Sequence, residues 1–174
     1  MIKGMRGVIF AVLAVALLAG CASGANTGAM IVPGVLNDAP NAKLAGKMAV
    51  GMIVGGQETS PLWISQVDNG AFRGALEESL RGHGYLASDQ AQTVYVIDAY
   101  LKELAQPFFG FDFTVRSAVD YSVAGGGNKR TIPVIATGTA TMSDAFLGAE
   151  RLRLANEKSI QENIQQLLRE LKRY

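Results

Sequence analysis

Residues 109–123 read FGFDFTVRSAVDYSV, and the alternation within this stretch decides the fold class. Its odd-numbered positions are apolar except Ser117, whereas its even-numbered positions are small or polar. This period of two predicts a β-strand with one buried face and one solvent-facing side. Three glycines at 125–127 and Asn128 follow, and they predict a tight turn into a second strand over residues 131–142. One face of that second strand carries Ile132, Val134, Ala136, Ala140 and Met142.

Two further strands and a helix are predicted upstream of this hairpin. Residues 47–54 (KMAVGMIV) form a short apolar run, which predicts a buried strand. Either Asp68 or Asn69 can cap a helix that continues to about Arg81. Residues 93–104 are rich in Val, Tyr and Ile and have apolar residues on both faces, as in a central strand. The apolar stripe of the helix consists of Phe72, Leu76 and Leu80.

The last part of the chain is helical and amphipathic. We expect a cap at Ser143 or Asp144 and a break between Gly148 and Asn156, because an unbroken helix here would be roughly 45 Å long. The predicted order is βαβββα, which makes an α+β two-layer sandwich with the helices on one face of an antiparallel-rich sheet. This domain spans residues 44–174, and the opposite sheet face is expected to be open. The apolar stripe of the last helix is Ile160, Ile164, Leu167, Leu168 and Leu171.

The first twenty residues are those of a targeting segment. Lys3 and Arg6 precede an apolar, uncharged run at 7–17, which is the pattern of a secretory signal peptide over residues 1–20. The run is too short to span a bilayer, which takes about 20 apolar residues. The next four residues resemble a bacterial lipobox, the site of signal peptidase II: Leu18, Ala19, Gly20 and Cys21. The alternative is a secreted protein with a leftover thiol.

The lipobox resemblance implies a lipid anchor on Cys21. In such proteins the thiol carries a diacylglycerol and the amine is acylated, and two or more acyl chains hold a protein stably on a membrane. Ala22 stands where an aspartate would retain the protein at the inner membrane, so the resemblance implies the periplasmic face of the outer membrane. Residues 21–43 are interpreted as a flexible tether spanning roughly 25 Å, with apolar docking points at 30–32 and 35–36. The alternative for this segment is an ordered strand.

Composition excludes several classes of protein. The net charge is +1, with 18% charged residues, and it becomes −1 once Lys3 and Arg6 are removed. A nucleic-acid-binding role is therefore not expected. The single cysteine, Cys21, excludes an internal disulfide framework and a zinc-cysteine cluster. The apolar content of 49% is enough for a packed core.

The search for catalytic chemistry finds little. His83, the only histidine, follows the predicted helix and is expected to interact with its terminal carbonyls. The glycines at 125–127 do not fit a phosphate-binding loop, because no Ser or Thr directly follows Lys129. Asn156 and Asn163 are interpreted as polar flanks or a cap of the last helix, with satisfied buried amides as the alternative. We expect no enzyme, no metal site, and no cofactor besides the lipid on Cys21.

Four residues are candidates for contact with a partner: Phe108, Asp112, Arg116 and Ile135. Phe109 and Phe111 fit the buried parity of the long strand, whereas Phe108 does not and is expected to project. The turn that contains it is either a core-capping turn or an aromatic anchor for a partner or membrane surface. Asp112 and Arg116 are placed with Asp120 on the solvent-facing side of the strand, too far apart for acid–base work.

The element order and the lipobox together resemble small periplasmic lipoproteins, although no single diagnostic motif is shared with any one group. The likeness includes YajG-like lipoproteins, LPS-assembly lipoproteins of the LptE type and auxiliary lipoproteins of ABC-type transporters. It implies a lipid-anchored, non-enzymatic accessory protein that binds an envelope protein during assembly or transport. Two alternatives remain open. One is a protein that binds or acts on an envelope lipid or glycolipid, and the other is an auxiliary subunit of an ABC transporter. The oligomeric state is not predicted.

Overall fold

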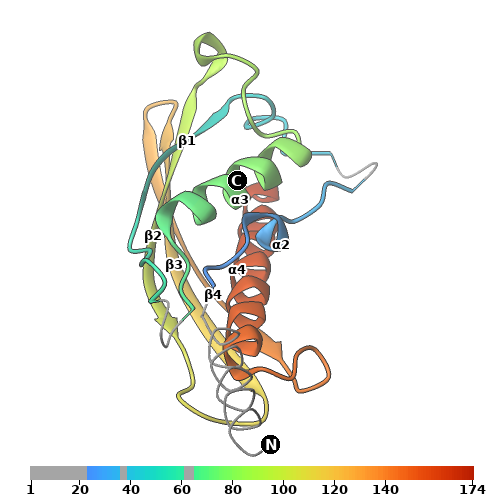
Figure 1. Ribbon diagram of the computed structural model, residues 1–174. Helices are drawn as coiled ribbons and strands as arrows, with labels where there is room; N and C mark the ends of the chain where they lie inside the picture. The colour runs from blue at the N-terminus through green and yellow to red at the C-terminus, as the bar shows by residue number, and fades with distance from the viewer. Residues whose placement is uncertain (1–22, 36–38, 61–64) are drawn as a thin grey trace, which may run out of the picture.

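A mixed four-stranded sheet with helices on one face makes up the molecule (Figure 1). A computed structural model describes residues 23–35, 39–60 and 65–174. The strand order is β1-β2-β3-β4, with β1 parallel to β2 and the other two pairs antiparallel. The predicted α+β fold and its βαβββα order are confirmed. The strands are β1 (Met48–Val54), β2 (Tyr95–Ala105), β3 (Phe113–Gly125) and β4 (Asn128–Ala140). The helices are α2 (Thr27–Met30), α3 (Asn69–Gly82), the 3-10 turn η1 (Gln90–Gln92) and α4 (Gly148–Lys172).

The β3–β4 hairpin forms as predicted around its glycine turn. Gly126 and Gly127 have φ angles of +57° and +80°, which a residue without a Cβ adopts at no steric cost. Gly125 pairs with Asn128 across this two-residue turn. The predicted alternation along β3 is confirmed, because its helix-facing side chains are buried: Phe113, Val115, Ser117, Val119, Tyr121 and Val123.

The amino-terminal end of β3 differs from the prediction. Phe109 and Phe111 were expected on the buried face, but both lie exposed in the loop before the strand. The register explains this difference, because Phe113 pairs with Ala140, the last residue of β4. Among the described residues no strand pairs with residues 109–112, so their apolar alternation continues past the point where the sheet ends.

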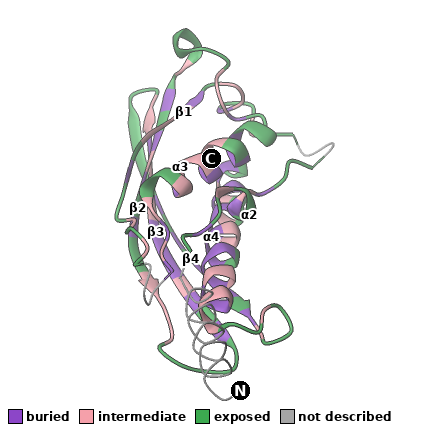
Figure 2. Cartoon of the chain, viewed as in Figure 1, coloured by how far each residue is buried: buried purple, intermediate pink, exposed green. Residues whose placement is uncertain are grey.

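The outer face of the sheet is exposed. In Figure 2 buried and exposed residues follow one another along the strands, and the helices lie on one side of the sheet. In β2 the buried residues Ile97 and Ala99 alternate with the exposed residues Val96 and Tyr100. The prediction of a central strand is confirmed, since β2 lies between β1 and β3, and its outer-face residues are exposed because no other described segment covers that side of the sheet.

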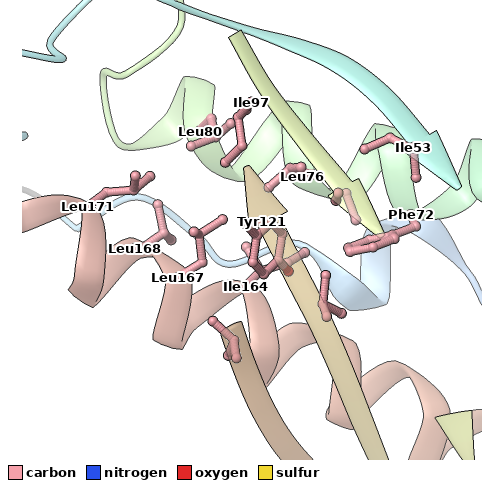
Figure 3. Close-up of a cluster of buried hydrophobic side chains, with 14 of the residues drawn as sticks. Ile53, Phe72, Leu76, Leu80, Ile97, Tyr121, Ile164, Leu167, Leu168 and Leu171 are labelled. Carbon is pink, nitrogen blue, oxygen red and sulfur yellow. The ribbon is translucent and has the colours of Figure 1, made fainter. Parts of the chain in front are cut away.

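Helix α3 begins and ends as predicted. The Asp68 carboxylate accepts a hydrogen bond from the backbone N–H of Ala71 (2.8 Å) and caps the helix. The apolar stripe predicted for this helix is fully buried, and Figure 3 shows Leu80 beside Ile97 in the same cluster as Tyr121 and Ile164. At the other end His83 Nδ1 lies 2.8 Å from the carbonyl oxygen of Ser79, as expected for a residue at a helix terminus.

Helix α4 is one unbroken helix, so the break predicted between Gly148 and Asn156 is wrong. Its length of about 37 Å matches a strand as long as β4, which spans roughly 43 Å. The first turns have apolar contacts of their own, because Leu152 and Ala155 pack with Phe113. Asp144 caps the preceding turn and not the helix, since its carboxylate accepts a hydrogen bond from the Thr141 N–H (2.7 Å).

The segment at 23–35 is packed against the domain, which differs from the flexible tether predicted for residues 21–43. Met30 and Val32 are buried in the main core, as the predicted docking point at 30–32 suggested. The backbone N–H of Val32 donates to Ser79 Oγ (2.9 Å), and that of Asn26 donates to Glu157 Oε1 (2.7 Å). These hydrogen bonds satisfy backbone polar groups of the segment and so hold it against the domain. Its sequence did not predict this, because it has neither a helical nor a strand period.

Two asparagines in α4 are inside the molecule and not at its polar flank. Asn163 Nδ2 donates to Ser117 Oγ (3.2 Å) and to the carbonyl oxygen of Val134 (3.3 Å). Asn156 Nδ2 donates to the carbonyl oxygen of Ser65 (2.9 Å). Both residues have no exposed surface, so the favoured interpretation was wrong and the buried-amide alternative is correct.

Candidate functional site

A groove on the open face of the sheet brings together two of the predicted contact residues. It has a volume of about 440 Å³, and Arg116 of β3 and Ile135 of β4 both line it. Ala118 forms its floor and is nearly buried, because longer side chains rise around it. Ile135 is 53% exposed, although it is a large apolar side chain in the middle of a strand. The groove therefore offers an exposed apolar contact between charged side chains on the open face.

Two ion pairs border the groove. Lys102 Nζ lies 3.0 Å from Asp120 Oδ1, and Arg116 pairs with Glu103 on the neighbouring strand. All four side chains keep much of their exposure, so each pair contributes little to folding. Their charges are close to balanced across the groove. A partner that binds here is selected by shape and hydrogen bonding more than by net charge.

The outer edge of β4 exposes backbone hydrogen-bonding groups. The two-residue turn makes Gly125 and Asn128 a hydrogen-bonded pair, so odd-numbered residues of β4 direct their N–H and C=O groups away from β3. Pro133 agrees with this parity, because a proline in a sheet belongs where its missing N–H faces outward. Within the part of the chain that the structure describes, no other segment hydrogen-bonds the outward backbone of Ile135, Thr137 or Thr139.

The opposite edge of the sheet is covered from Met48 to Gly51. Leu86 forms a parallel bridge with Met48, and the backbone N–H of Ala87 donates to the Met48 carbonyl oxygen (2.9 Å). Further along β1, the guanidinium of Arg73 donates to the carbonyl oxygens of Val50 (3.3 Å) and Gly51. Covering an edge in this way blocks the addition of a strand. The contrast leaves β4 as the accessible edge.

Two hollows between β4 and α4 lie along the accessible edge. One, of about 570 Å³, is lined by residues 135–139 and by Lys158, Glu162 and Gln166 of α4. The other, of about 360 Å³, lies beside Pro133 and is lined on its helix side mainly by charged side chains. An extended segment paired with β4 would have room for its side chains above these polar walls. The charged residues of the second hollow are Arg130, Arg169, Glu170 and Arg173.

Exposed apolar side chains gather at one end of the molecule. They come from the β2–β3 loop at 106–112 and from the β4–α4 connection at 141–147, which lie together at the lower end of Figure 1. The β3–β4 register brings the two loops side by side, since Phe113 pairs with Ala140. A mainly apolar hollow of about 600 Å³ lies beneath them, between Phe108 and Leu152. We name as the aromatic tip Phe108, Phe109, Phe111, Met142, Phe146 and Leu147.

The structure separates the four predicted contact residues into two places. Arg116 and Ile135 lie on the groove, whereas Phe108 and Asp112 lie in the loop of the tip. Asp112 was expected on the strand face with Arg116, and this was wrong because β3 begins one residue later. Phe108 projects as predicted and is 93% exposed. The lipobox residues at 18–21 and the signal segment at 1–20 lie outside the described residues.

Sequence reasoning missed the β4 edge and half of the tip. Pro133 inside an otherwise regular strand was an available signal, because proline is confined to edge strands. Phe146 and Leu147 follow the last strand directly and were available as apolar residues in a loop. Among the described residues, no group of three His, Cys, Asp or Glu side chains could hold a metal ion. Nor does the described part of the chain contain a helix long and apolar enough to cross a membrane.

Comparison with known proteins finds likeness only among solved structures, because no family model and no curated protein matches the chain. A "putative lipoprotein" of Caulobacter crescentus aligns at 12% identity and a TM-score of 0.44, over 72% of this chain and 88% of its own. A DUF330 protein of Xanthomonas campestris aligns at 10% identity and a TM-score of 0.47, over 79% and 92%. A hypothetical protein of Chlamydia trachomatis aligns at 13% identity and a TM-score of 0.44, over 73% and 93%. Likenesses this distant carry no information about function.

Proposed function

We propose that this protein is a lipid-anchored, non-enzymatic accessory that binds an extended segment of an envelope protein along the edge of β4. Acylation of Cys21 holds it at the periplasmic face of the outer membrane. The observation that carries the binding proposal is the contrast between the sheet edges. β1 is covered by Leu86 and by the Arg73 guanidinium, whereas the outward backbone groups of residues 135–139 are accessible.

Strand addition suits this edge for physical reasons. A partner strand gains affinity from main-chain hydrogen bonds and specificity from the pockets that receive alternate side chains. The Ile135 side chain supplies an apolar contact on the outer face, and the polar hollow beside α4 receives side chains on the other face. Pro133 interrupts the edge and limits pairing of long strands, a device that natural sheets use against indiscriminate aggregation. The usable part of the edge is therefore short, from Ile135 to Thr139.

Site-specific photo-cross-linking in cells tests the proposal. A photoreactive residue at Thr139 is expected to cross-link to one envelope protein, and one at Met52, which is exposed beside the covered part of the β1 edge, is not. Thr137→Pro removes an outward N–H without breaking the β3–β4 ladder and is expected to abolish the cross-link. Thr137→Val keeps that N–H and is the matched control. A cross-link that persists unchanged in Thr137→Pro would contradict binding along this edge.

A lipid-handling role is the second candidate, and the hollow beneath the aromatic tip favours it. That hollow has a volume of about 600 Å³ and is lined by Leu104, Phe108, Phe113 and Leu152 together with small and polar residues. Mass spectrometry of the purified protein separates the two roles, since a stoichiometric non-covalent lipid or glycolipid without a cross-linked protein supports lipid handling. A cross-linked inner-membrane transporter component would identify the partner as an ABC transporter and move the site of action to that membrane.

A further inference from the structure

We propose that the aromatic tip docks on the surface of a lipid bilayer, beside the acylated Cys21, and so fixes the orientation of the domain on the membrane. The proposal rests on the lipidation proposed above and goes beyond partner binding at β4. It concerns a surface that neither the groove nor the β4 edge uses. Its occupant is the bilayer itself, and a protein that covers the tip is an outcome that the test can distinguish.

The tip is presented by a supported structure and not by loose loops. The guanidinium of Arg151 is nearly buried and donates to the carbonyl oxygens of Ala145 (3.0 Å) and Phe146 (2.7 Å). The same guanidinium lies over the ring of Phe113, 5.2 Å from its centroid. Two partly buried hydrogen bonds to the backbone and a cation–π contact thus hold the loop that displays Phe146, which is 81% exposed.

The second loop is held just as firmly. Gln106 Nε2 donates to the carbonyl oxygen of Ser65 (2.8 Å) and to Oδ1 of the buried Asn156 (2.9 Å). The loop that follows displays Phe108 and Phe109 to solvent although its base is fixed. Exposed apolar patches on supported loops mark sites of interaction, whereas single exposed apolar residues need no explanation.

The charge around the tip suits a bilayer. Residues 106–111 and 145–149 contain no charged side chain. Asp144 is at the margin of the tip, and its carboxylate is paired with Lys158 Nζ at 2.9 Å. A hydrogen bond from the Thr141 backbone and that from Lys158 lower the pKa of Asp144 to about 2. Asp112 follows Phe111 in the same loop and is exposed, so its carboxylate stays on the aqueous side while the apolar side chains enter the headgroup region, as aromatic residues of interfacial segments do.

The position of the anchor selects the bilayer as occupant. The hydroxyl of Ser65 donates to the carbonyl oxygen of Ser23 (2.8 Å), and the carbonyl of the same Ser65 accepts from Gln106. One residue therefore joins Ser23 to the base of the Phe108 loop. Cys21 lies two residues before Ser23, a span of at most about 7 Å. An acylated Cys21 enters the membrane on the side of the domain that carries the tip, far from the β3–β4 turn.

The tip acts on orientation more than on affinity. Two or more acyl chains already anchor a protein stably, so further apolar contacts add little to residence on the membrane. Linked to the anchor, however, they bind at a high effective concentration and hold one face of the domain against the lipid. The readout must therefore be the depth of the tip in the bilayer and not the amount of protein bound.

Fluorescence quenching by brominated lipid measures that depth. The mature acylated protein is reconstituted into vesicles of phosphatidylethanolamine and phosphatidylglycerol containing phosphatidylcholine brominated near the headgroup end of its acyl chains. Phe108→Trp and Phe146→Trp are expected to lose about half of the fluorescence of the introduced indole, relative to vesicles without bromine. Val96→Trp, exposed on the open sheet face, is the matched control and is expected to lose almost none. The unsubstituted protein gives the background of the single native tryptophan.

The outcomes separate the tip from the anchor. Intact-mass measurement reports acylation of Cys21 independently of quenching. Equal quenching of Phe108→Trp and Val96→Trp in an acylated protein overturns the tip proposal and leaves lipidation intact. Protection of the tip indoles from both bromine and aqueous iodide means that a protein covers the tip, and this also overturns the proposal. An unacylated protein that still shows tip quenching supports the tip and refutes the anchor, whereas one that neither floats with vesicles nor shows quenching refutes both.

Discussion

The hydroxyl of Tyr121 donates a 2.8 Å hydrogen bond to Oδ1 of Asn163, and neither side chain has exposed surface. The bond joins the middle of β3 to the middle of α4. The Asn163 amide nitrogen donates to Ser117 Oγ and to the carbonyl oxygen of Val134, so the whole amide group is hydrogen-bonded inside an apolar core. Figure 3 shows Tyr121 among its apolar neighbours. Such a pair is costly to break from one side, because the remaining partner stays buried and unsatisfied.

The Tyr121–Asn163 pair gives the first prediction. Asn163→Leu is expected to lower the free energy of unfolding by about 1–3 kcal/mol, the penalty for an unsatisfied buried hydroxyl. Tyr121→Phe is expected to cost about 1–2 kcal/mol, because it leaves the buried Asn163 Oδ1 without its donor. The double variant should cost less than the sum of the two, because neither polar group then remains. Urea denaturation of the four proteins measures this coupling, and strict additivity would show that the two side chains do not interact.

Alkaline pH provides a second prediction from the same residue. Burial raises the pKa of Tyr121 far above its usual value near 10. The unfolded chain therefore ionises this tyrosine first, so the folded protein loses stability as the pH rises above about 10, by up to about 1.4 kcal/mol per pH unit. Tyr121→Phe should flatten this fall. Urea midpoints measured on both proteins between neutral and alkaline pH test it, and parallel curves would contradict it.

A third prediction concerns the close approach of α4 to β4 at Gly138. A Cβ at this position would lie 2.1 Å from the backbone nitrogen of Ser159 and 2.5 Å from the carbonyl oxygen of Ala155. Gly138→Ala must therefore push the helix from the strand, at a cost of about 1–3 kcal/mol or more. Gly148→Ala is the matched control, since its Cβ meets only ordinary contacts and a helix favours alanine. Thermal unfolding should show a lower midpoint for Gly138→Ala alone.

The packed segment at 23–35 supplies a fourth prediction. Ser79 Oγ accepts from the Val32 N–H, so Ser79→Ala leaves that buried donor unsatisfied, at about 1–3 kcal/mol. Hydrogen exchange in residues 26–32 should accelerate in this variant, while exchange in β3 should change much less. Ser122→Ala is the control, because the buried hydroxyl of Ser122 has no partner within the described structure. Unchanged exchange at 26–32 in Ser79→Ala would show that the hydrogen bond does not hold the segment.

Membrane attachment is the fifth prediction. Cys21→Ala removes the thiol that the lipobox resemblance places under acylation, so the protein should leave the outer-membrane fraction after carbonate and salt washes. The unsubstituted protein should stay in that fraction and carry the added mass of acyl chains. A Cys21→Ala protein that still sediments with the outer membrane after both washes would refute the lipidation.

The sheet and α3 were predictable because their local signals agree with their surroundings. The alternation in β3 predicts one buried and one solvent-exposed face, and the glycines at 126–127 predict the turn. Phe109 and Phe111 show the limit of that signal, since periodicity does not reveal where the partner strand ends. Asn156 and Asn163 show another limit. An amide next to an apolar stripe can lie on the solvent-exposed side of the helix, or it can be buried and hydrogen-bonded to another element, and the sequence pattern is the same in both cases.

The candidate surfaces were less predictable than the fold. Ile135 was recognised as an exposed apolar residue, but the accessibility of the β4 edge depends on which edge Leu86 and Arg73 cover, and these residues are distant in sequence from β4. The aromatic tip likewise combines two loops that only the β3–β4 register brings together. Each half is visible in the sequence, whereas their adjacency is a property of the folded chain.

The packing of residues 23–35 changes how the protein would search for its partner. With these residues folded onto α3 and α4, only Ala22 separates the proposed acylation site, Cys21, from the packed segment. A lipid-anchored protein with so short a linker diffuses in the plane of the membrane and cannot sample the depth of the periplasm. Encounters then depend on the lateral density of partners in the same leaflet, and a partner in the opposite membrane has to bridge the gap with its own chain.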